Sequence, residues 1–325
     1  MVRFAVIGTN FITDSFLEAG AECEGFKAQA VYSRTMERAK EYAEKYGIED
    51  CYDSLEDLAE APDIDAVYVA SPNALHASQS IQMMEAGKHV LCEKTIASNS
   101  KELKEMLETA ERNHVVLLEA MRPVFDPGFA AIQENLPRLV KIRRATFQYC
   151  QYSRRYDHFK EGIIENAFKP ELSNGALMDI GVYCVHPLVK LFGKPKEVYA
   201  HGLKLSTGVD GSAVIVAMYE EMQAELLYAK ITQSALPSQI QGEEASMIIR
   251  EIPDTTSIEI VKRDGTSEKI DIRKKENNMY YEVEEFIRLI EEKKSAREHN
   301  QYSVWSLEVM DEARQQMGIH FPADD

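Results

Sequence analysis

The chain has few cysteines and no apolar stretch long enough to cross a membrane. Five cysteines are scattered over 325 residues, and no two have the CxxC spacing of a zinc or redox site. An odd number of dispersed thiols is typical of a reducing compartment. No run of about 18 apolar residues occurs, and the N-terminal residues lead directly into a glycine-containing turn. We therefore expect a cytoplasmic protein without a signal peptide, a membrane anchor or a metal site.

Basic residues are also scarce relative to acidic ones. The sequence has 37 Lys and Arg against 54 Asp and Glu, for a formal net charge of -17. Such a surface repels nucleic-acid phosphates and anionic lipid headgroups, so we expect neither as a partner. With 45% hydrophobic and 28% charged residues the composition is that of a globular protein. The length suits two domains.

Short apolar runs alternate with amphipathic stretches through residues 1–121. Runs such as Ala66–Ala70 and His89–Cys92 lack polar alternation, which is typical of parallel strands buried on both faces. Helical patterns separate them, for example Ala74–Ala86, which closes at Gly87. The alternation predicts an α/β domain with a doubly wound parallel sheet of the Rossmann type, with six strands if a short one lies near Cys51.

The pattern changes from residue 122 onward. Residues 145–150 alternate in polarity, and further strand patterns follow between residues 198 and 272, separated by turn sequences such as Val209-Asp210-Gly211 and Arg263-Asp264-Gly265. We predict that residues 122–325 form an α+β domain on a large, open, mainly antiparallel sheet. The last of two C-terminal helices, which carries Trp305, could pack back on the first domain. An open sheet exposes one face, so we expect a homodimer or a higher homo-oligomer.

The turn after the first strand has part of a dinucleotide-binding fingerprint. In GxGxxG the glycines permit a tight bend and let backbone amides approach a pyrophosphate. Only Gly8 is retained here, while Asn10, a residue type that tolerates a positive φ, and Thr13 replace the other two glycines. An ordinary strand-to-helix turn is the alternative. As a cofactor site the turn would use Gly8, Thr9, Asn10, Phe11 and Ile12.

The end of the second strand discriminates between the two nicotinamide cofactors. An acidic residue there binds the ribose of NAD, whereas a cation accommodates the phosphate of NADP. Ser33 and Arg34 occupy this place. A guanidinium matches a phosphate with two hydrogen bonds, so NADP is favoured over NAD. The alternative is that Arg34 only points into solvent.

Three further segments carry a family resemblance. They are Ser71-Pro72-Asn73-Ala74-Leu75-His76, the strand end Glu93-Lys94-Thr95, and Asp179-Ile180-Gly181-Val182-Tyr183. Together they resemble the glucose-fructose oxidoreductase, inositol dehydrogenase and rhizopine catabolism (Gfo/Idh/MocA) family, nearest to its dihydrodiol dehydrogenase branch, over nearly the whole chain. The resemblance implies an oxidoreductase that transfers a hydride between NAD(P) and a hydroxyl or carbonyl carbon of a small sugar, polyol or diol.

The resemblance also implies roles for individual residues. Thr95 replaces a proline that is commonly cis, and a cis bond before a non-proline residue costs about 2.5 to 4 kcal/mol, so this bond is either trans or held cis by its surroundings. The cofactor-binding residues that it implies are Ser71, Pro72, Asn73, His76, Glu93 and Lys94. We add Arg122, which lies just beyond the sixth strand.

The resemblance maps the family's catalytic lysine onto Lys94 and its DxGxY motif onto Asp179, Gly181 and Tyr183, and the chemistry suggests a role for three of them. Hydride transfer at an alcohol carbon needs a proton partner for the hydroxyl and a charge that stabilises the alkoxide. Tyr183 suits the proton, provided that a cation lowers its pKa from about 10, and Lys94 is the candidate cation. Asp179 lies four residues before Tyr183 and would share its helix face, orienting the lysine or the substrate. His186 is more typical of a structural histidine.

Two other functions fit parts of the pattern. The altered glycine turn and Thr95 would suit a nucleotide-binding regulatory protein without turnover, although Lys94, Asp179 and Tyr183 argue against it. An NAD-dependent glycosidase of the same fold is the other alternative, and Arg34 argues against that. The sequence does not specify the substrate, the direction of reaction or its stereochemistry.

Overall fold

The computed structural model describes residues 1–325 and divides them into two compact units. The first unit combines Met1–Arg122 with Lys275–Gln301, and the second combines Pro123–Lys274 with Tyr302–Asp325. The first boundary lies one residue from the predicted one. The C-terminal segment of the first unit, Lys275–Gln301, includes the first turn of the Trp305 helix (Arg297–Met317), and Asn300 in that turn donates to the carbonyl of Leu117 at 2.9 Å. The predicted return of this helix therefore holds for its N-terminal end, while the rest of it belongs to the second unit.

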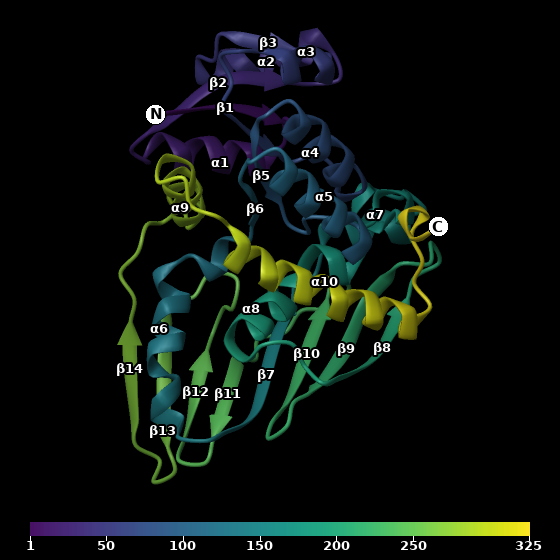
Figure 1. The fold of residues 1–325 in the computed structure, drawn as a ribbon. Helices are drawn as coiled ribbons and strands as arrows, with labels where there is room; N and C mark the ends of the chain where they lie inside the picture. The colour runs from purple at the N-terminus through teal and green to yellow at the C-terminus, as the bar shows by residue number, and fades with distance from the viewer. The chain divides into compact units, whose positions relative to one another are not determined.

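The first unit contains the predicted parallel sheet (Figure 1). Its strand order is β3-β2-β1-β4-β5-β6, so the direction of winding reverses between β1 and β4. In such sheets ligands bind beside the carboxyl ends of the strands at this reversal. The strands are β1 (Val2–Ile7), β2 (Phe26–Tyr32), β3 (Asp50–Tyr52), β4 (Ala66–Val69), β5 (His89–Glu93) and β6 (Leu117–Ala120).

Polar side chains begin most of the helices of this unit. Asn10, Thr35, Ser54 and Asn99 each accept a hydrogen bond from a backbone amide in the first turn of the helix that follows. The predicted helical stretches are confirmed within a few residues. The helices are α1 (Phe11–Ala21), α2 (Met36–Tyr46), α3 (Leu55–Glu60), α4 (His76–Glu85), α5 (Ser100–Arg112) and α9 (Met279–Glu291).

Helix α9 completes the aromatic core of the first unit. Its Phe286 is fully buried, and the ring centroid lies 5.9 Å from that of Phe4 on β1. Phe4 in turn stacks on Phe26 of β2 at 4.8 Å. The amphipathic period of α9 predicts a helix with one buried face, but does not specify which sheet that face covers. The burial of large aromatic rings explains why this segment belongs to the first unit.

The second unit is built on the predicted open sheet, shown in the lower part of Figure 1. Its order is β14-β13-β12-β11-β7-β10-β9-β8, and every neighbouring pair is antiparallel except β7 with β10. The strands are β7 (Ile142–Cys150), β8 (Glu197–Lys204), β9 (Asp210–Met218), β10 (Gln223–Ala229), β11 (Ser238–Gly242), β12 (Ala245–Ile249), β13 (Ser257–Lys262) and β14 (Ser267–Asp271). Its helices are α6 (Pro127–Asn135), α7 (Arg154–Lys160), α8 (Val182–Phe192) and, from Tyr302 onward, α10 (Arg297–Met317).

One predicted turn in this sheet is wrong and another is confirmed. Asp210 begins strand β9 and is 1% exposed, whereas the chain reverses at residues 206–209, where Gly208 has φ 92°. Asp210 is taken into the strand because its carboxylate accepts a hydrogen bond from a buried amide, that of Leu177. The Arg263-Asp264-Gly265 turn is confirmed, and Gly265 has φ 86°.

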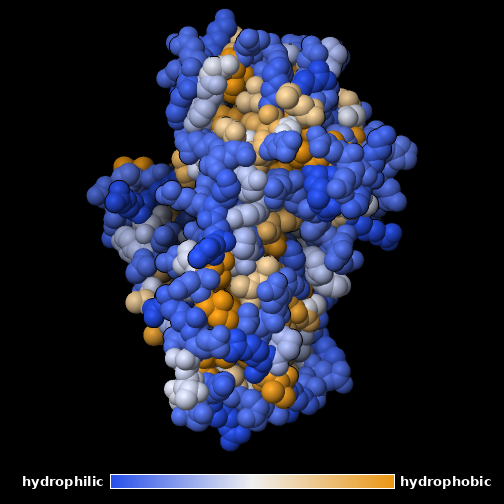
Figure 2. Space-filling model, turned by 90° about the vertical axis from the view of Figure 1, so that its left-hand side faces the viewer, coloured by the Kyte–Doolittle hydropathy of each residue, from blue (hydrophilic) through white to orange (hydrophobic).

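A side chain from α10 pairs with backbone groups on the free edge of strand β8. Gln316 accepts from the amide of Ala200 at 2.8 Å and donates to the carbonyl of Val198 at 2.8 Å, as a neighbouring strand would. Tyr199 and Leu203 of β8 remain 56% and 57% exposed. Figure 2 shows another face of the protein, where apolar residues form small groups among hydrophilic ones. The self-association expected for the open sheet stays a prediction.

One helical stretch, Pro170–Phe192, meets the length and hydropathy criteria for a membrane span. Of its most apolar 18-residue window, 78% is buried inside the protein. Core helices of globular proteins commonly have this composition, so the stretch is weak evidence for a membrane segment.

Candidate active site

The turn after β1 is shaped to receive a close ligand. Gly8 has φ 116°, and a Cβ added there would lie 2.7 Å from the carbonyl oxygen of Ala70, so only glycine fits. Asn10 has φ -117° and needs no left-handed conformation; its side chain caps α1 by accepting from the amide of Ile12 at 3.0 Å, and it donates to Ala70 at 2.9 Å. Phe11 is 70% exposed at the start of α1. A tight glycine turn at a helix N-terminus fits a dinucleotide pyrophosphate.

Two arginines stand near this turn. Arg34 follows β2 and is exposed, as is Ser33 in part. Arg38, which the sequence analysis missed, donates to the hydroxyl and the carbonyl oxygen of Thr9, each at 3.2 Å. Arg38 lies on α2, four residues after Arg34 in the sequence, and this spacing could have indicated a second arginine near the turn. The pair supplies guanidinium groups of the kind that binds a phosphate, and that of Arg38 also pairs with Glu41 at 2.7 Å.

The segments after β4 and β5 are joined by His76. Its Nδ1 lies 2.9 Å from the carbonyl oxygen of Thr95, and its Nε2 lies 2.7 Å from that of Ser71. The ring is 1% exposed, and burial lowers its pKa, which the carbonyl oxygens of Thr95 and Ser71 oppose. His76 therefore connects these two segments, and its predicted contact with a cofactor remains a prediction. Ser71, Pro72 and Asn73 are partly exposed beyond β4, where the predicted contacts remain predictions.

Lys94 lies at the carboxyl end of β5, next to a buried carboxylate. Lys94 is partly exposed, and its peptide bond to Thr95 is cis. Glu93 accepts from the hydroxyl of Tyr68 at 2.5 Å and from the amide of Lys94 at 3.2 Å. Glu93 is 7% exposed, and its predicted contact with a cofactor remains a prediction. Burial raises its pKa, and the charges of Lys94 and Arg122 oppose that rise.

Helix α9 adds a second buried carboxyl group that the sequence analysis missed. Glu282 is fully buried, and neither carboxyl oxygen has a hydrogen-bond partner. Burial raises its pKa well above the usual range, and the neighbouring charges of Glu93 and Glu119 add to this, opposed by Arg122. Burial thus favours the protonated form of Glu282. The charge of Arg122, which was predicted to bind the cofactor, lowers the pKa values of Glu93 and Glu282.

The second unit carries Asp179 and Tyr183 on a helical segment with an irregular first turn. Residues Leu177–Gly181 form a π turn that leads into α8, so the spacing between Asp179 and Tyr183 is not that of one regular α-helix. Tyr183 is 7% exposed, and its ring packs edge-on against Tyr149 at 5.8 Å. Asp179 forms an ion pair with Lys230. Lys230 follows β10, and no sequence pattern pointed to it.

Asp210 holds the start of this helical segment through a hydrogen bond. Its carboxylate accepts from the amide of Leu177 at 2.8 Å. A Cβ added at Gly175, where φ is 148°, would lie 2.3 Å from Asp210 Oδ1, so glycine is needed here. Burial raises the pKa of Asp210 from 3.8 to about 6, and the amides of Leu177 and Ala176 and the hydroxyl of Tyr228 limit the rise.

Replacing Asp210 by asparagine should change how stability depends on pH. A raised pKa means that the folded state binds the proton more tightly than the unfolded state, so the contribution of Asp210 is greatest below about pH 4 and is lost as the pH rises to about 6. A shift of two pKa units corresponds to about 3 kcal/mol. Urea unfolding at several pH values should show wild type losing about this much relative to Asp210→Asn between pH 4 and pH 7. Parallel stability curves would contradict the assignment.

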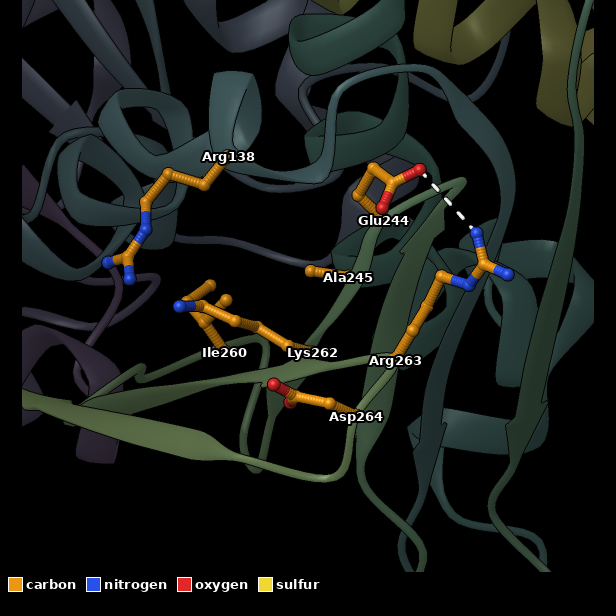
Figure 3. A pocket seen from close by; sticks show the side chains of 7 residues that line it. All are labelled: Arg138, Glu244, Ala245, Ile260, Lys262, Arg263 and Asp264. Atoms are coloured by element: carbon orange, nitrogen blue, oxygen red, sulfur yellow. Dashed lines mark ion pairs between the residues drawn. The ribbon is translucent and has the colours of Figure 1, made fainter.

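A hollow of about 520 Å³ in the second unit is separate from these residues. Figure 3 shows Arg138 on one side of it and, on the other, side chains of β12 and β13, of Glu244 just before β12, and of the turn after β13. Arg263 pairs with Glu244 at 3.5 Å within the hollow, and Arg138 pairs with Glu268 at 2.6 Å. Its cations are thus largely neutralised by neighbouring carboxylates. The hollow contains none of the predicted site residues.

A glycine turn at a helix N-terminus on a doubly wound sheet, with a lysine at the end of β5, fits a nicotinamide-dependent oxidoreductase. Comparison with known families agrees. Residues 2–121 match the oxidoreductase family with an NAD-binding Rossmann fold, and residues 138–248 match the GFO/IDH/MocA C-terminal domain. The chain belongs to this family and is an NAD(P)-dependent enzyme acting on CH–OH groups, which confirms the resemblance read from the sequence.

The chain resembles several characterised proteins over nearly its whole length. It is 49% identical to scyllo-inositol 2-dehydrogenase (NADP(+)) IolU of Bacillus subtilis, over 100% of this chain and 99% of that protein. It is 30% identical to trans-1,2-dihydrobenzene-1,2-diol dehydrogenase of Danio rerio, over 99% of each. Among solved structures, a variant of the 3-ketoreductase KijD10 from Actinomadura kijaniata, in complex with TDP-benzene and NADP, has a TM-score of 0.88 at 21% identity, covering 97% of this chain and 98% of that one.

Proposed function

We propose that the protein is an NADP-dependent dehydrogenase or reductase of a cyclic polyol or a closely related sugar, in which Lys94 and Tyr183 act on the substrate oxygen. The observation that carries the proposal is the partly exposed Lys94 at the end of β5, backed by the buried carboxylate of Glu93. The resemblance to a scyllo-inositol 2-dehydrogenase supports a polyol ring as the substrate class.

The two residues have different tasks. The nicotinamide, when bound, accepts or supplies the hydride. The ammonium of Lys94 stabilises negative charge on the substrate oxygen, and the phenol of Tyr183 takes or returns the proton of that oxygen. Asp179 accepts a hydrogen bond from a substrate hydroxyl.

The preference for NADP rests on the residues that follow β2. Arg34 and Arg38 supply two guanidinium groups, and the 2′-phosphate of NADP would be bound by them. NAD lacks this phosphate and would lose those contacts. NAD therefore remains a weaker alternative cofactor rather than an excluded one.

The experiment that tests this function is an assay of inositols, sugars, diols and their ketones with both cofactors, comparing wild type with Arg34→Ala. We expect turnover of a polyol with NADP by wild type. The variant should raise KM for NADP by about tenfold or more, since one charge-assisted contact is worth about 1.5 to 3 kcal/mol, and should change KM for NAD little.

Lys40→Ala is the matched control, because it removes another exposed cation from α2. This control should leave both KM values unchanged. Equal effects of Arg34→Ala on the two cofactors would refute the phosphate assignment. Absence of NADP-linked turnover on every polyol, sugar and diol tested would refute the proposed substrate class.

A further inference from the structure

Lys230 is a nearly buried lysine whose position is fixed by its backbone. Its amide donates to the carbonyl of Gly211 at 2.8 Å, and its own carbonyl accepts from the amide of Ser153 at 2.8 Å. The side chain is 6% exposed, and its Nζ lies 6.0 Å from the ring centroid of Phe168. The ammonium pairs with the carboxylate of Asp179 on the neighbouring helical segment. The backbone of Lys230 is therefore held in place, and its side chain extends from there to Asp179.

The two members of this ion pair differ in exposure. The side chain of Asp179 is 28% exposed, whereas that of Lys230 is 6% exposed. The ammonium thus lies behind the carboxylate, and the carboxylate is the member that reaches solvent. A substrate hydroxyl can contact Asp179 from the open side without meeting Lys230.

Stability alone does not account for a lysine at this place. Transfer of an ammonium from water into the interior is costly, and buried ion pairs can often be replaced by apolar residues of similar size without loss of stability. Met or Leu would fill the space beside Phe168 without that cost. The positive charge is instead suited to fixing the orientation and the ionisation of a carboxylate that binds substrate.

We propose that Lys230 is a positioning residue that holds Asp179 oriented and ionised, so that Asp179 can accept a hydrogen bond from a hydroxyl of the polyol substrate. This inference rests on the proposed function, because it assigns a role within the same reaction. Lys230 does not itself touch the substrate. Its effect on catalysis passes through the Asp179 carboxylate.

The test is a double-mutant cycle between the two residues, measured as kcat/KM for the polyol with NADP. Lys230→Met should lower kcat/KM by about 100-fold, the loss typical of a misplaced substrate-binding group. Lys230→Arg keeps the charge and should recover a substantial part of it. In the Asp179→Asn background, Lys230→Met should have little further effect, because a residue that acts only through Asp179 has nothing left to position.

Lys274→Met is the matched control for loss of a buried ion pair. Lys274 also lies in the second unit, its side chain is 6% exposed, and it pairs with Asp126 at 2.7 Å. This variant should lose stability but keep the wild-type kcat/KM per folded molecule. NADP binding, followed by titration of protein fluorescence, should be the same in wild type and in every Lys230 variant.

Each outcome has a definite meaning. Wild-type kcat/KM in folded Lys230→Met would overturn the inference, and so would equal losses in the two Asp179 backgrounds. If Lys230→Met does not fold, the Asp179→Asn/Lys230→Met variant, which removes both charges, together with Lys230→Arg still decides between positioning and packing. Absence of turnover in wild type itself would instead contradict the proposed function.

Discussion

Replacing Lys94 by methionine should lower kcat by about 1,000-fold while NADP still binds. Methionine keeps the length of the side chain but removes the ammonium, and with it the charge that stabilises the substrate oxygen as an alkoxide. Removal of one such stabilising group typically costs 10²- to 10³-fold or more in rate. Steady-state rates with a polyol substrate and NADP measure the effect, and a fluorescence titration measures cofactor affinity.

A surface lysine of the same unit provides the control. Lys104 on α5 is 78% exposed and faces Glu108 at 3.9 Å, so Lys104→Met removes a solvated charge only. It should retain wild-type rates and wild-type stability. If Lys94→Met turned over within a few-fold of wild type, the proposed mechanism would have to be abandoned.

Replacing Tyr183 by phenylalanine should have the second large effect. The ring contact with Tyr149 at 5.8 Å does not need the hydroxyl, so the variant should fold. Loss of the proton donor or acceptor should lower kcat by about 10²- to 10⁴-fold. The limb of the pH–rate profile that reports proton transfer by Tyr183 should disappear in this variant.

The matched variant is Tyr219→Phe, which removes a hydroxyl that donates to the carbonyl of Gly193 at 3.0 Å. Tyr219 lies in the same unit but in no proposed site, so its loss should cost some stability and leave kcat unchanged. Comparable losses in the two variants would mean that Tyr183 acts through packing. A Tyr183→Phe enzyme with the full wild-type pH profile would also contradict its assigned role.

The sequence predicted those features that depend on local pattern. Strand β4 (Ala66–Val69) is buried at every residue, and its unbroken apolar run indicated a parallel strand. The lysine at the end of β5 and the Asp179 segment were found from motifs. The antiparallel character of the second sheet followed from alternation, although β11 was not predicted.

Features that depend on contacts between distant residues were not predictable in this way. Lys230 lies 51 residues from Asp179, so no spacing links them. The π turn at Leu177–Gly181 occurs where the amide of Leu177 binds the carboxylate of Asp210, which sequence patterns do not show. His76 and Glu93 lie in the expected segments, but only coordinates reveal that both side chains point inward.

The return of α9 to the nucleotide-binding unit has a consequence for biosynthesis. Phe286, which packs on Phe4 of β1, is translated long after the six strands of that unit. A nascent chain that has emerged only as far as Arg122 would present Phe4 and Phe26 without this covering helix. The ribosome must therefore deliver residues 275–301 before the N-terminal half can reach its final core, and until then that half is a natural client for chaperones.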